Sequence, residues 1–339
     1  MYIRNLYSIF VLIFCFLVST QLAAQKSDTT AFKPHGKPII KIFSNFHTSL
    51  SDGNENSAFE VNKAYFGYSY QLSNEFSVII KLDIGSPDDG SSYSLLKRYA
   101  YFKNAALKYT KGKLCINFGL IDLFQFKVQT KIWGHRYIYK SFQDVYKFGL
   151  SADIGANIIY IFNKKISADF TIMNGEGYKK LQTDDTYKCA LGITYIPLKN
   201  LTTRIYFDLT QKDISQSTLS TFAGYKFLKK FSLGFEFNYK SNYQFQKDNN
   251  MIGISTYTSY EINKKFQLFG RYDHLSSNKI IDEEHPWNLL KDGSAIIAGI
   301  QFTPIKQIKI ALNYQDWVPY AKDISNESYI FVNFEYKIN

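Results

Sequence analysis

Apolar and polar residues alternate along most of the chain from Pro38 onward, in runs of roughly ten residues. In the run 76–84, apolar residues occupy every even position, whereas Ser77, Lys81 and Asp83 occupy odd ones. A period of two is typical of a β-strand with two unlike faces. The pattern predicts about sixteen strands, at 38–50, 58–72, 76–84, 98–110, 113–121, 151–162, 166–174, 187–197, 201–212, 218–228, 231–243, 251–262, 266–275, 293–304, 308–317 and 326–338.

The segments between these runs alternate strictly between short and long. The short ones are rich in Lys and Asn, at 73–75, 111–113, 163–165, 198–200, 228–230, 263–265 and 305–307. The long ones are 51–57, 85–97, 122–150, 175–186, 213–217, 244–250, 276–292 and 318–325. Short periplasmic turns and longer extracellular loops are typical of an up-and-down barrel in the bacterial outer membrane. In the run 98–110 the alternation slips around Asn104 to Ala106, which indicates either a β-bulge or a misplaced strand boundary.

The fold class predicted is therefore all-β, a transmembrane antiparallel up-and-down β-barrel of about 16 strands. A mean hydropathy of −0.22 does not oppose this, because a barrel strand faces lipid on one side and water on the other. The alternative is a secreted β-sandwich. Charges such as Arg204 and Glu236 in mid-strand, opposite uniformly apolar faces, disfavour it. A barrel of sixteen strands encloses an aqueous channel.

The N-terminal residues have the features of an export signal. Arg4 precedes the apolar run Leu6 to Val18, and small residues follow at Ala23 and Ala24. We expect a signal peptide at 1–24, because the apolar run is shorter than a spanning helix of about 20 residues. Residues 25–37 are then a polar periplasmic lead-in, and 38–339 form the barrel. No later segment is long enough for a transmembrane helix.

The stretch 122–160 carries a family resemblance. Trp133-Gly134-His135-Arg136-Tyr137 in the longest loop, followed by Asp153 to Gly155 at the start of a strand, resembles the phosphate-selective porin O and P family, in its Bacteroidetes-type form. The resemblance implies a homotrimeric porin whose third extracellular loop folds into the channel. The constriction would then contain Lys127, Lys131, Trp133, His135, Arg136, Tyr137 and Lys140. For Trp133 and Tyr137 we favour packing against the barrel wall over contact with a solute.

The positions of the charged residues determine whether such a pore would prefer anions or cations. The net charge is +11, but ten lysines lie in or beside the short turns, away from a constriction. The predicted inner faces mix both signs, with a predicted pore lining of Lys81, Asp83, Arg204, Asp208, Arg271, Asp273 and Lys309. The 5 arginines are too scattered for the ladder that a phosphate-specific channel needs. We expect passive diffusion of small hydrophilic solutes with a weak anion preference set by the basic loop.

Other functions have weaker support. A hydrolase needs an oriented Ser–His pair, and His274 with Ser276 and Ser277 is the only close set. A transporter of hydrophobic molecules needs a plug, for which 26–37 is too short.

No zinc spacing or phosphate-binding glycine motif occurs, so we expect neither metal nor cofactor. Because the chain is expected to be exported, we do not expect it to bind nucleic acid. The expected partners are outer-membrane lipid, the solutes and the barrel assembly machinery, whose C-terminal signal the last strand resembles apart from Asn339.

Overall fold

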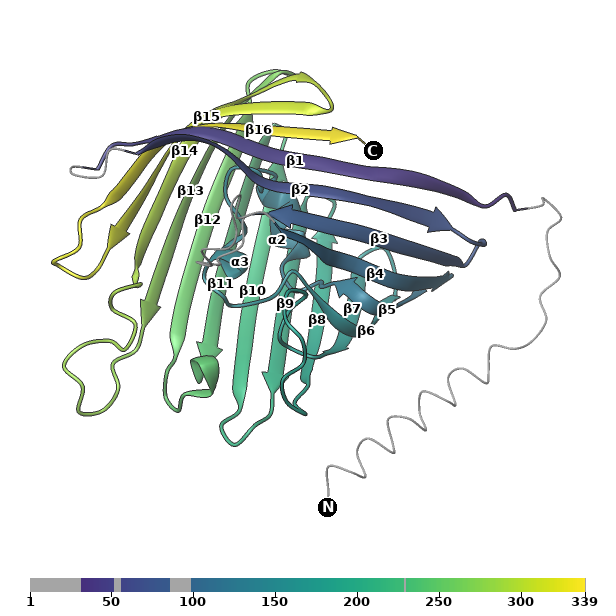
Figure 1. The fold of residues 1–339 in the computed structure, drawn as a ribbon, viewed down its shortest axis with the longest axis horizontal. Coiled ribbons are helices and arrows are strands. Elements are labelled where there is room, and N and C mark those ends of the chain that lie inside the picture. The colour runs from purple at the N-terminus through teal and green to yellow at the C-terminus, as the bar shows by residue number, and fades with distance from the viewer. Residues whose placement is uncertain (1–31, 52–55, 86–98, 229, 339) are drawn as a thin grey trace. The chain divides into compact units, whose positions relative to one another are not determined.

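The computed structural model describes residues 32–51, 56–85, 99–228 and 230–338, so the predicted signal peptide lies outside the described residues. Sixteen antiparallel strands close into one barrel, with β1 paired to β16 (Figure 1). They are β1 (His35–Ser49), β2 (Ser57–Gln71), β3 (Phe76–Gly85), β4 (Tyr99–Lys111), β5 (Leu114–Asp122), β6 (Ala152–Ile161), β7 (Ile166–Met173), β8 (Lys188–Leu198), β9 (Leu201–Thr210), β10 (Gln216–Phe227), β11 (Phe231–Ser241), β12 (Met251–Glu261), β13 (Phe266–Ser277), β14 (Gly293–Ile305), β15 (Ile308–Pro319) and β16 (Glu327–Ile338).

All sixteen predicted strands are confirmed, with each end within three residues of its predicted position. The largest difference is at the start of β1, where His35 to Lys37 already pair with β2. The predicted lead-in 25–37 is therefore too long at its C-terminal end. Because every strand neighbours the next in sequence, the short turns all lie at one end of the barrel and the long loops at the other.

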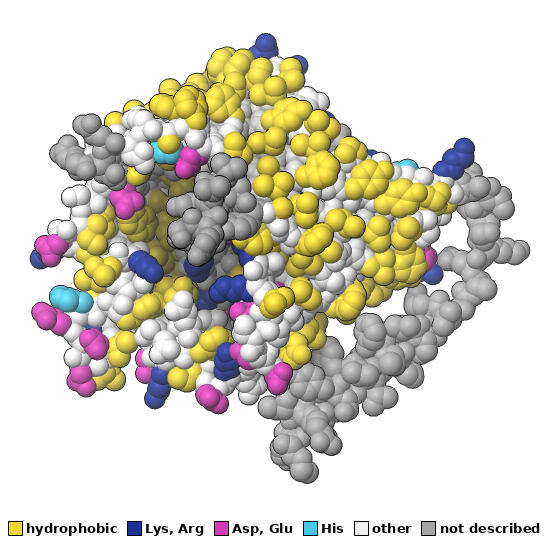
Figure 2. Space-filling model, viewed as in Figure 1, with side chains coloured by type: hydrophobic (Ala, Val, Ile, Leu, Met, Phe, Trp, Pro, Cys, Tyr) yellow, Lys and Arg dark blue, Asp and Glu magenta, His cyan; other side chains and the backbone are white. Residues whose placement is uncertain are grey.

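Apolar side chains cover much of the outer surface of the barrel that is visible in Figure 2. Phe66, Phe118 and Ile205 are each more than half exposed, whereas their strand neighbours Tyr65 and Arg204 are buried on the inside. An outward apolar face is what contact with lipid requires of a barrel strand. Among the described helices, none is both long and apolar enough to span a bilayer.

Two β-bulges lie well inside strands, both on the β1–β4 side. The β3–β4 register shifts between Lys81 and Leu82, so Lys103 has no partner in the ladder and both Lys103 and Asn104 are buried inside. Of the two interpretations of the slip in this run, the structure thus has the bulge, at Lys103. The β1–β2 register shifts between Phe43 and Ser44, which leaves Asn62 as the extra residue. A bulge places two successive side chains on one face, so each delivers an additional polar group to the interior.

Candidate functional site: a loop inside the barrel

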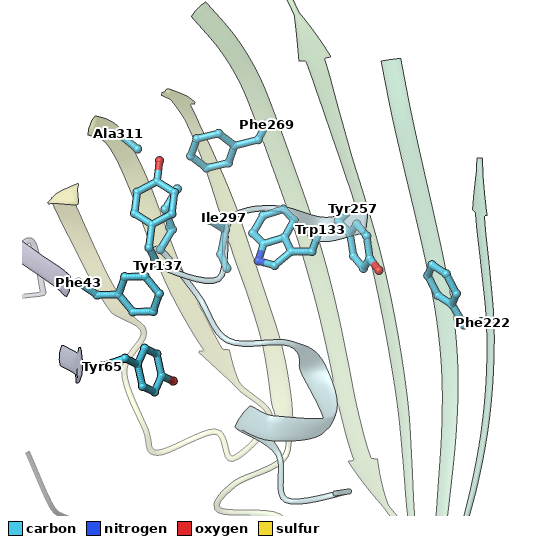
Figure 3. Close-up of a cluster of buried hydrophobic side chains, with 10 residues drawn as sticks. Phe43, Tyr65, Trp133, Tyr137, Phe222, Tyr257, Phe269, Ile297 and Ala311 are labelled. Atoms are coloured by element: carbon cyan, nitrogen blue, oxygen red, sulfur yellow. The ribbon is translucent and has the colours of Figure 1, made fainter. Parts of the chain in front are cut away.

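The third long loop, residues 123–151, lies inside the barrel; we call it L3. It contains α2 (Lys127–Trp133), a short α3 (Phe142–Val145) and, between them, the residues that reach furthest across the interior. Trp133, Tyr137 and Ile138 of L3 pack in one buried cluster whose wall residues come from both β1–β2 and β10–β15 (Figure 3). Because one loop segment contacts so much of the circumference, L3 divides the lumen.

Aromatic packing holds L3 against the strands. Trp133 is 2% exposed, its indole donates to the Tyr139 carbonyl at 2.9 Å, and its ring lies 5.5 Å from that of Tyr257. Further along, Phe142 is fully buried beside Gly253 of β12, where an added Cβ would overlap the phenyl ring. Burying rings of this size supplies the largest apolar contribution to such a contact. Trp133 thus packs against the wall, and Tyr137 packs in the same buried cluster and donates its hydroxyl to Gln301 of β14 at 2.9 Å.

A buried ion pair on β7 and β9 fixes the start of L3. Arg204 binds Asp169 through two bonds of 2.7 and 2.9 Å, and its Nε donates to the Gln125 carbonyl of L3 at 3.3 Å. The two side chains reach each other across β8 at Gly192, where a Cβ would overlap the guanidinium. Two parallel hydrogen bonds between guanidinium and carboxylate hold both groups in a defined geometry.

A second buried pair holds the middle of L3. Arg271 on β13 binds Asp273 through bonds of 2.8 and 2.7 Å, and its Nη1 donates to the Lys140 carbonyl at 2.7 Å. The guanidinium carbon also lies 5.3 Å from the Trp133 ring centre, a cation–π distance. Arg271 therefore contacts L3 at two points. We call the inner surface of β7–β13 that L3 covers the seat.

Backbone carbonyls of L3 accept several more bonds from the wall. Tyr257 donates its hydroxyl to Gln129 at 3.1 Å, and Lys240 donates its ammonium to Lys147 at 2.7 Å. The Lys147 backbone has a φ of 62°, in the left-handed region that non-glycine residues rarely adopt. The wall thus holds L3 largely through carbonyl oxygens, which a sequence pattern does not reveal.

Four predicted pore-lining residues are corrected by these contacts. Arg204, Asp208, Arg271 and Asp273 point inward, but L3 covers them and they are 3%, 0%, 4% and 0% exposed. Asp208 accepts from the Tyr206 hydroxyl at 3.0 Å and lies 3.9 Å from the Lys188 ammonium. The alternation along the strands correctly indicated that these side chains point inward. It could not show which part of the wall a loop covers, so it did not predict that L3 separates them from the channel.

The open side of L3 borders a cavity of about 510 Å³, which we call the vestibule. L3 contributes one side and β1, β2, β15 and β16 contribute the other. The lining is Phe43, Asn45, His47, Glu60, Asn62, Lys63, Arg136, Tyr137, Ile138, Tyr139, Lys140, Asp144, Val145, Lys147, Gln315, Tyr329, Phe331 and Asn333. Cationic residues there outnumber carboxylates by four to two.

Half of the vestibule cations are already paired. Arg136 lies 2.6 Å from Asp144, and Lys63 lies 3.1 Å from Asp83. Burial alone would raise the pKa of Asp144, but the charges of Arg136 and Lys140 outweigh it, so that pKa is lowered and the carboxylate stays ionised. Lys140 and Lys147 are exposed, and no carboxylate among the described residues forms an ion pair with either. These two lysines are the cations available to a solute.

The other predicted site residues lie outside the vestibule lining. Lys127 and Lys131 are exposed on α2, and Lys127 covers the Phe124 ring. Lys309 donates to the Gly134 carbonyl at 3.3 Å and pairs with Glu335 at 3.7 Å. Lys81 pairs with Asp122 at 3.5 Å. Asp83 is 1% exposed and accepts from the Tyr178 hydroxyl at 2.5 Å, so its predicted place in the pore lining is also corrected.

His135 has a structural position in L3. Its ring is 2% exposed, and Nδ1 donates to the Trp133 carbonyl at 2.6 Å. Burial lowers the pKa of His135 to about 4, so the ring is neutral at physiological pH. It therefore contributes packing and a hydrogen bond to L3, and no charge to the lumen.

The residues that the sequence-based site omitted include Glu60 and Lys63 of the vestibule. Lys63 points inward because of the bulge at Asn62, whose side-chain oxygen accepts from Asn45 at 2.7 Å. A break in the alternation between Glu60 and Tyr65 was the available signal. This break could be interpreted as a bulge only once the pairing of β2 with β1 was known.

Comparisons with known proteins agree on the type of barrel. Residues 198–285 match the family model described as oligogalacturonate-specific porin protein (KdgM), which is less than half of the chain. No curated protein matches the chain. The similar solved structures include three outer-membrane channels.

The outer membrane channel DcaP of Acinetobacter baumannii is 10% identical, with a TM-score of 0.64 over 94% of this chain and 100% of that one. OmpF of Salmonella typhi, solved with daunomycin, is 10% identical, with a TM-score of 0.66 over 89% and 97%. An anion-selective porin from Comamonas acidovorans is 12% identical, with a TM-score of 0.64 over 90% and 100%. At these identities the likeness establishes the fold, so the chain has the sixteen-stranded barrel fold of outer-membrane porins.

Proposed function

We propose that this chain is a porin of the bacterial outer membrane that lets small hydrophilic solutes diffuse passively, with a weak preference for anions. The vestibule carries the proposal. It is a cavity of about 510 Å³ between an inward loop and the barrel wall, lined by charged side chains of both signs. Selectivity in such a channel depends on the charges at its narrow part, and here Lys140 and Lys147 leave a small cationic excess.

The barrel and its surface support the location. The outward faces are apolar and the closed sheet has no free edge, which are the conditions for a stable barrel in lipid. Insertion by the barrel assembly machinery and assembly into a homotrimer are parts of this proposal, drawn from the C-terminal strand and the family resemblance. Crosslinking of the protein in native membranes, followed by mass measurement, tests the trimer.

Phosphate specificity is not part of the proposal. Arg204 and Arg271 are each bound in a buried carboxylate pair, and Arg136 is bound to Asp144, so none is free for a phosphate. Arg98 lies outside the described residues. A closer relationship to the phosphate-selective porin O and P family stays a proposal, supported by the residues quoted from 122–160.

The matched KdgM segment does not supply a solute either. Residues 198–285 form β9–β13, which belong to the seat, whereas the vestibule is built from L3, β1, β2, β15 and β16. An enzyme has no better support. His274 contacts the Tyr320 hydroxyl, and Ser277 donates its hydroxyl to Asp292 at 2.5 Å, so the two do not form the pair that a serine hydrolase needs.

Conductance in planar lipid bilayers tests the function. Purified protein, with its fold checked by circular dichroism, is added under a KCl gradient, and single-channel steps and the reversal potential are measured. We expect open channels and a reversal potential of the sign that chloride dominance produces. Folded protein without conductance would refute the porin, and a cation-dominated reversal potential would refute the anion preference. Hydrolysis of detergent-dispersed lipid would favour the enzyme instead.

A further inference from the structure

The vestibule continues into a second cavity. This cavity measures about 210 Å³ and lies against β14, β15 and β16. The two share four lining residues, Tyr139, Gln315, Tyr329 and Phe331, so they are neighbouring parts of one space. The shared residues lie between the charged groups of the first cavity and those of the second.

Unpaired charges of opposite sign lie on either side of this shared part. On L3, Lys140 and Lys147 are exposed and have no carboxylate partner among the described residues. On β16, Glu327 is exposed, lines the second cavity and has no cationic partner among those residues. Glu327 alternates in register with Tyr329 and Phe331, so its side chain is on the inner face.

Asp316 is a different case, although it also borders the second cavity. It lies on β15 at the parity of the lipid-facing Leu312 and Tyr314, and its carboxylate accepts from the Ser328 hydroxyl at 2.7 Å. Its charge is therefore directed to the outer rim, and Glu327 is the carboxylate that a solute in the second cavity would meet. In the first cavity, Asp144 is paired with Arg136. Glu60 on β2 is exposed, accepts from the Asn62 amide at 3.3 Å and forms no ion pair among the described residues, so its charge offsets part of that of Lys140 and Lys147.

Aromatic rings occupy the space between the two charged sides. Tyr329 and Phe331 have ring centres 5.7 Å apart, and His47 lies 5.4 Å from Phe331. All three rings line the vestibule, and Tyr139 of L3 is on its other side. Flat apolar faces bind a flat apolar ring by removing both from water. A simple ion has no apolar surface, so contact with these rings does not stabilise its binding.

We propose that the vestibule and the second cavity together bind zwitterions whose ring separates the carboxylate from the ammonium, such as 4-(aminomethyl)benzoate. The carboxylate of the solute lies toward Lys140 and Lys147, its ring against Tyr329 and Phe331, and its ammonium toward Glu327. This assignment rests on the proposed porin function and names a solute class for it. Two opposite charges with a ring between them are matched by a dipolar solute better than by a simple anion or cation.

Single-channel current block tests the assignment. Three probes share a benzene ring and differ in charge: 4-(aminomethyl)benzoate is a zwitterion, 4-methylbenzoate an anion and 4-methylbenzylamine a cation. We expect 4-(aminomethyl)benzoate to have the longest residence time at neutral pH. Glu327→Gln should shorten that residence roughly threefold without shortening that of 4-methylbenzoate, because a partly exposed charge contact is worth a modest factor. Lys140→Gln should shorten both. Lys279→Gln, in an exposed loop away from the cavities, is the control.

The outcomes separate this inference from the porin function. Channels that conduct KCl but are blocked equally by 4-(aminomethyl)benzoate and 4-methylbenzoate would overturn the zwitterion site and leave the porin intact. The zwitterion site is also overturned if Glu327→Gln changes neither residence time or shortens both equally. Absence of KCl conductance from folded protein would instead refute the porin, and this inference with it. Circular dichroism of each variant establishes that the barrel has formed.

Discussion

The inner wall of this barrel has two sides that treat charge in opposite ways. On the seat, Arg204 and Arg271 are buried in two-bond carboxylate pairs and also bind carbonyls of L3. Beside the vestibule, Lys140, Lys147 and Glu327 are exposed and unpaired among the described residues. The strands on both sides show the same alternation. The difference comes from L3, which turns one half of a polar lumen into a protein interior and leaves the other half to solutes.

This contrast separates stability from selectivity. A buried charge that loses its partner is destabilising because its desolvation is no longer offset, while an exposed charge contributes little to folding. A free charge beside a narrow passage, in contrast, acts directly on permeating ions. Substitutions on the seat should therefore change folding and the position of L3, whereas substitutions at the vestibule should change ion preference in a stable barrel.

The largest expected effect is on the seat. Asp169→Ala leaves the Arg204 guanidinium buried without its carboxylate, and we expect a loss of about 3–5 kcal/mol in the free energy of unfolding. Urea unfolding in detergent, followed by tryptophan fluorescence, measures it. Glu75→Ala removes the partner of Lys111 from an exposed pair and should cost at most about 1 kcal/mol. Equal losses in the two variants would show that the seat is not a buried interface.

The second effect is a pH dependence of the L3 packing. Burial lowers the pKa of His135 to about 4 in the folded chain, against about 6.5 when unfolded. The unfolded chain thus binds a proton more readily, so this contribution to stability is complete above pH 6.5 and is lost as the pH falls toward 4. The total is on the order of 3 kcal/mol. Unfolding at pH 7 and pH 4.5 measures it, and His135→Gln should reduce the difference between the two. An unchanged pH dependence would contradict a buried neutral His135.

The third effect is on ion preference. Lys140→Glu reverses an unpaired charge beside the vestibule, and we expect the chloride-to-potassium permeability ratio to fall by roughly two- to fourfold. Lys131→Glu makes the same change on an exposed L3 lysine outside the vestibule lining, so it should change the ratio much less. Reversal potentials under a KCl gradient give both ratios. A larger change in Lys131→Glu would place the selective region elsewhere.

The sequence predicted the barrel well and the site only in part, for a physical reason. Alternation and turn lengths are local, so they gave all sixteen strands and the irregularity near Asn104. The inward position of L3 was implied by family resemblance alone. Which residues L3 buries depends on where it lies among distant strands, and parity treats Arg204 and Glu327 alike. The bulge at Asn62, which turns Lys63 inward, is defined by pairing with β1 and was missed.

The smallest expected effect concerns a pair within the vestibule itself. The side chains of Arg136 and Asp144 are each 18% exposed and lie 2.6 Å apart. Their exposure is intermediate between that of the buried pairs on the seat and that of Lys140. Asp144→Asn keeps the shape but removes the negative charge, which frees Arg136 to act on passing anions. We expect the chloride-to-potassium permeability ratio to rise by less than about twofold, in the direction opposite to Lys140→Glu. A fall in the ratio would mean that Arg136 holds L3 in place as Arg204 does, and that the boundary between seat and vestibule runs through this pair.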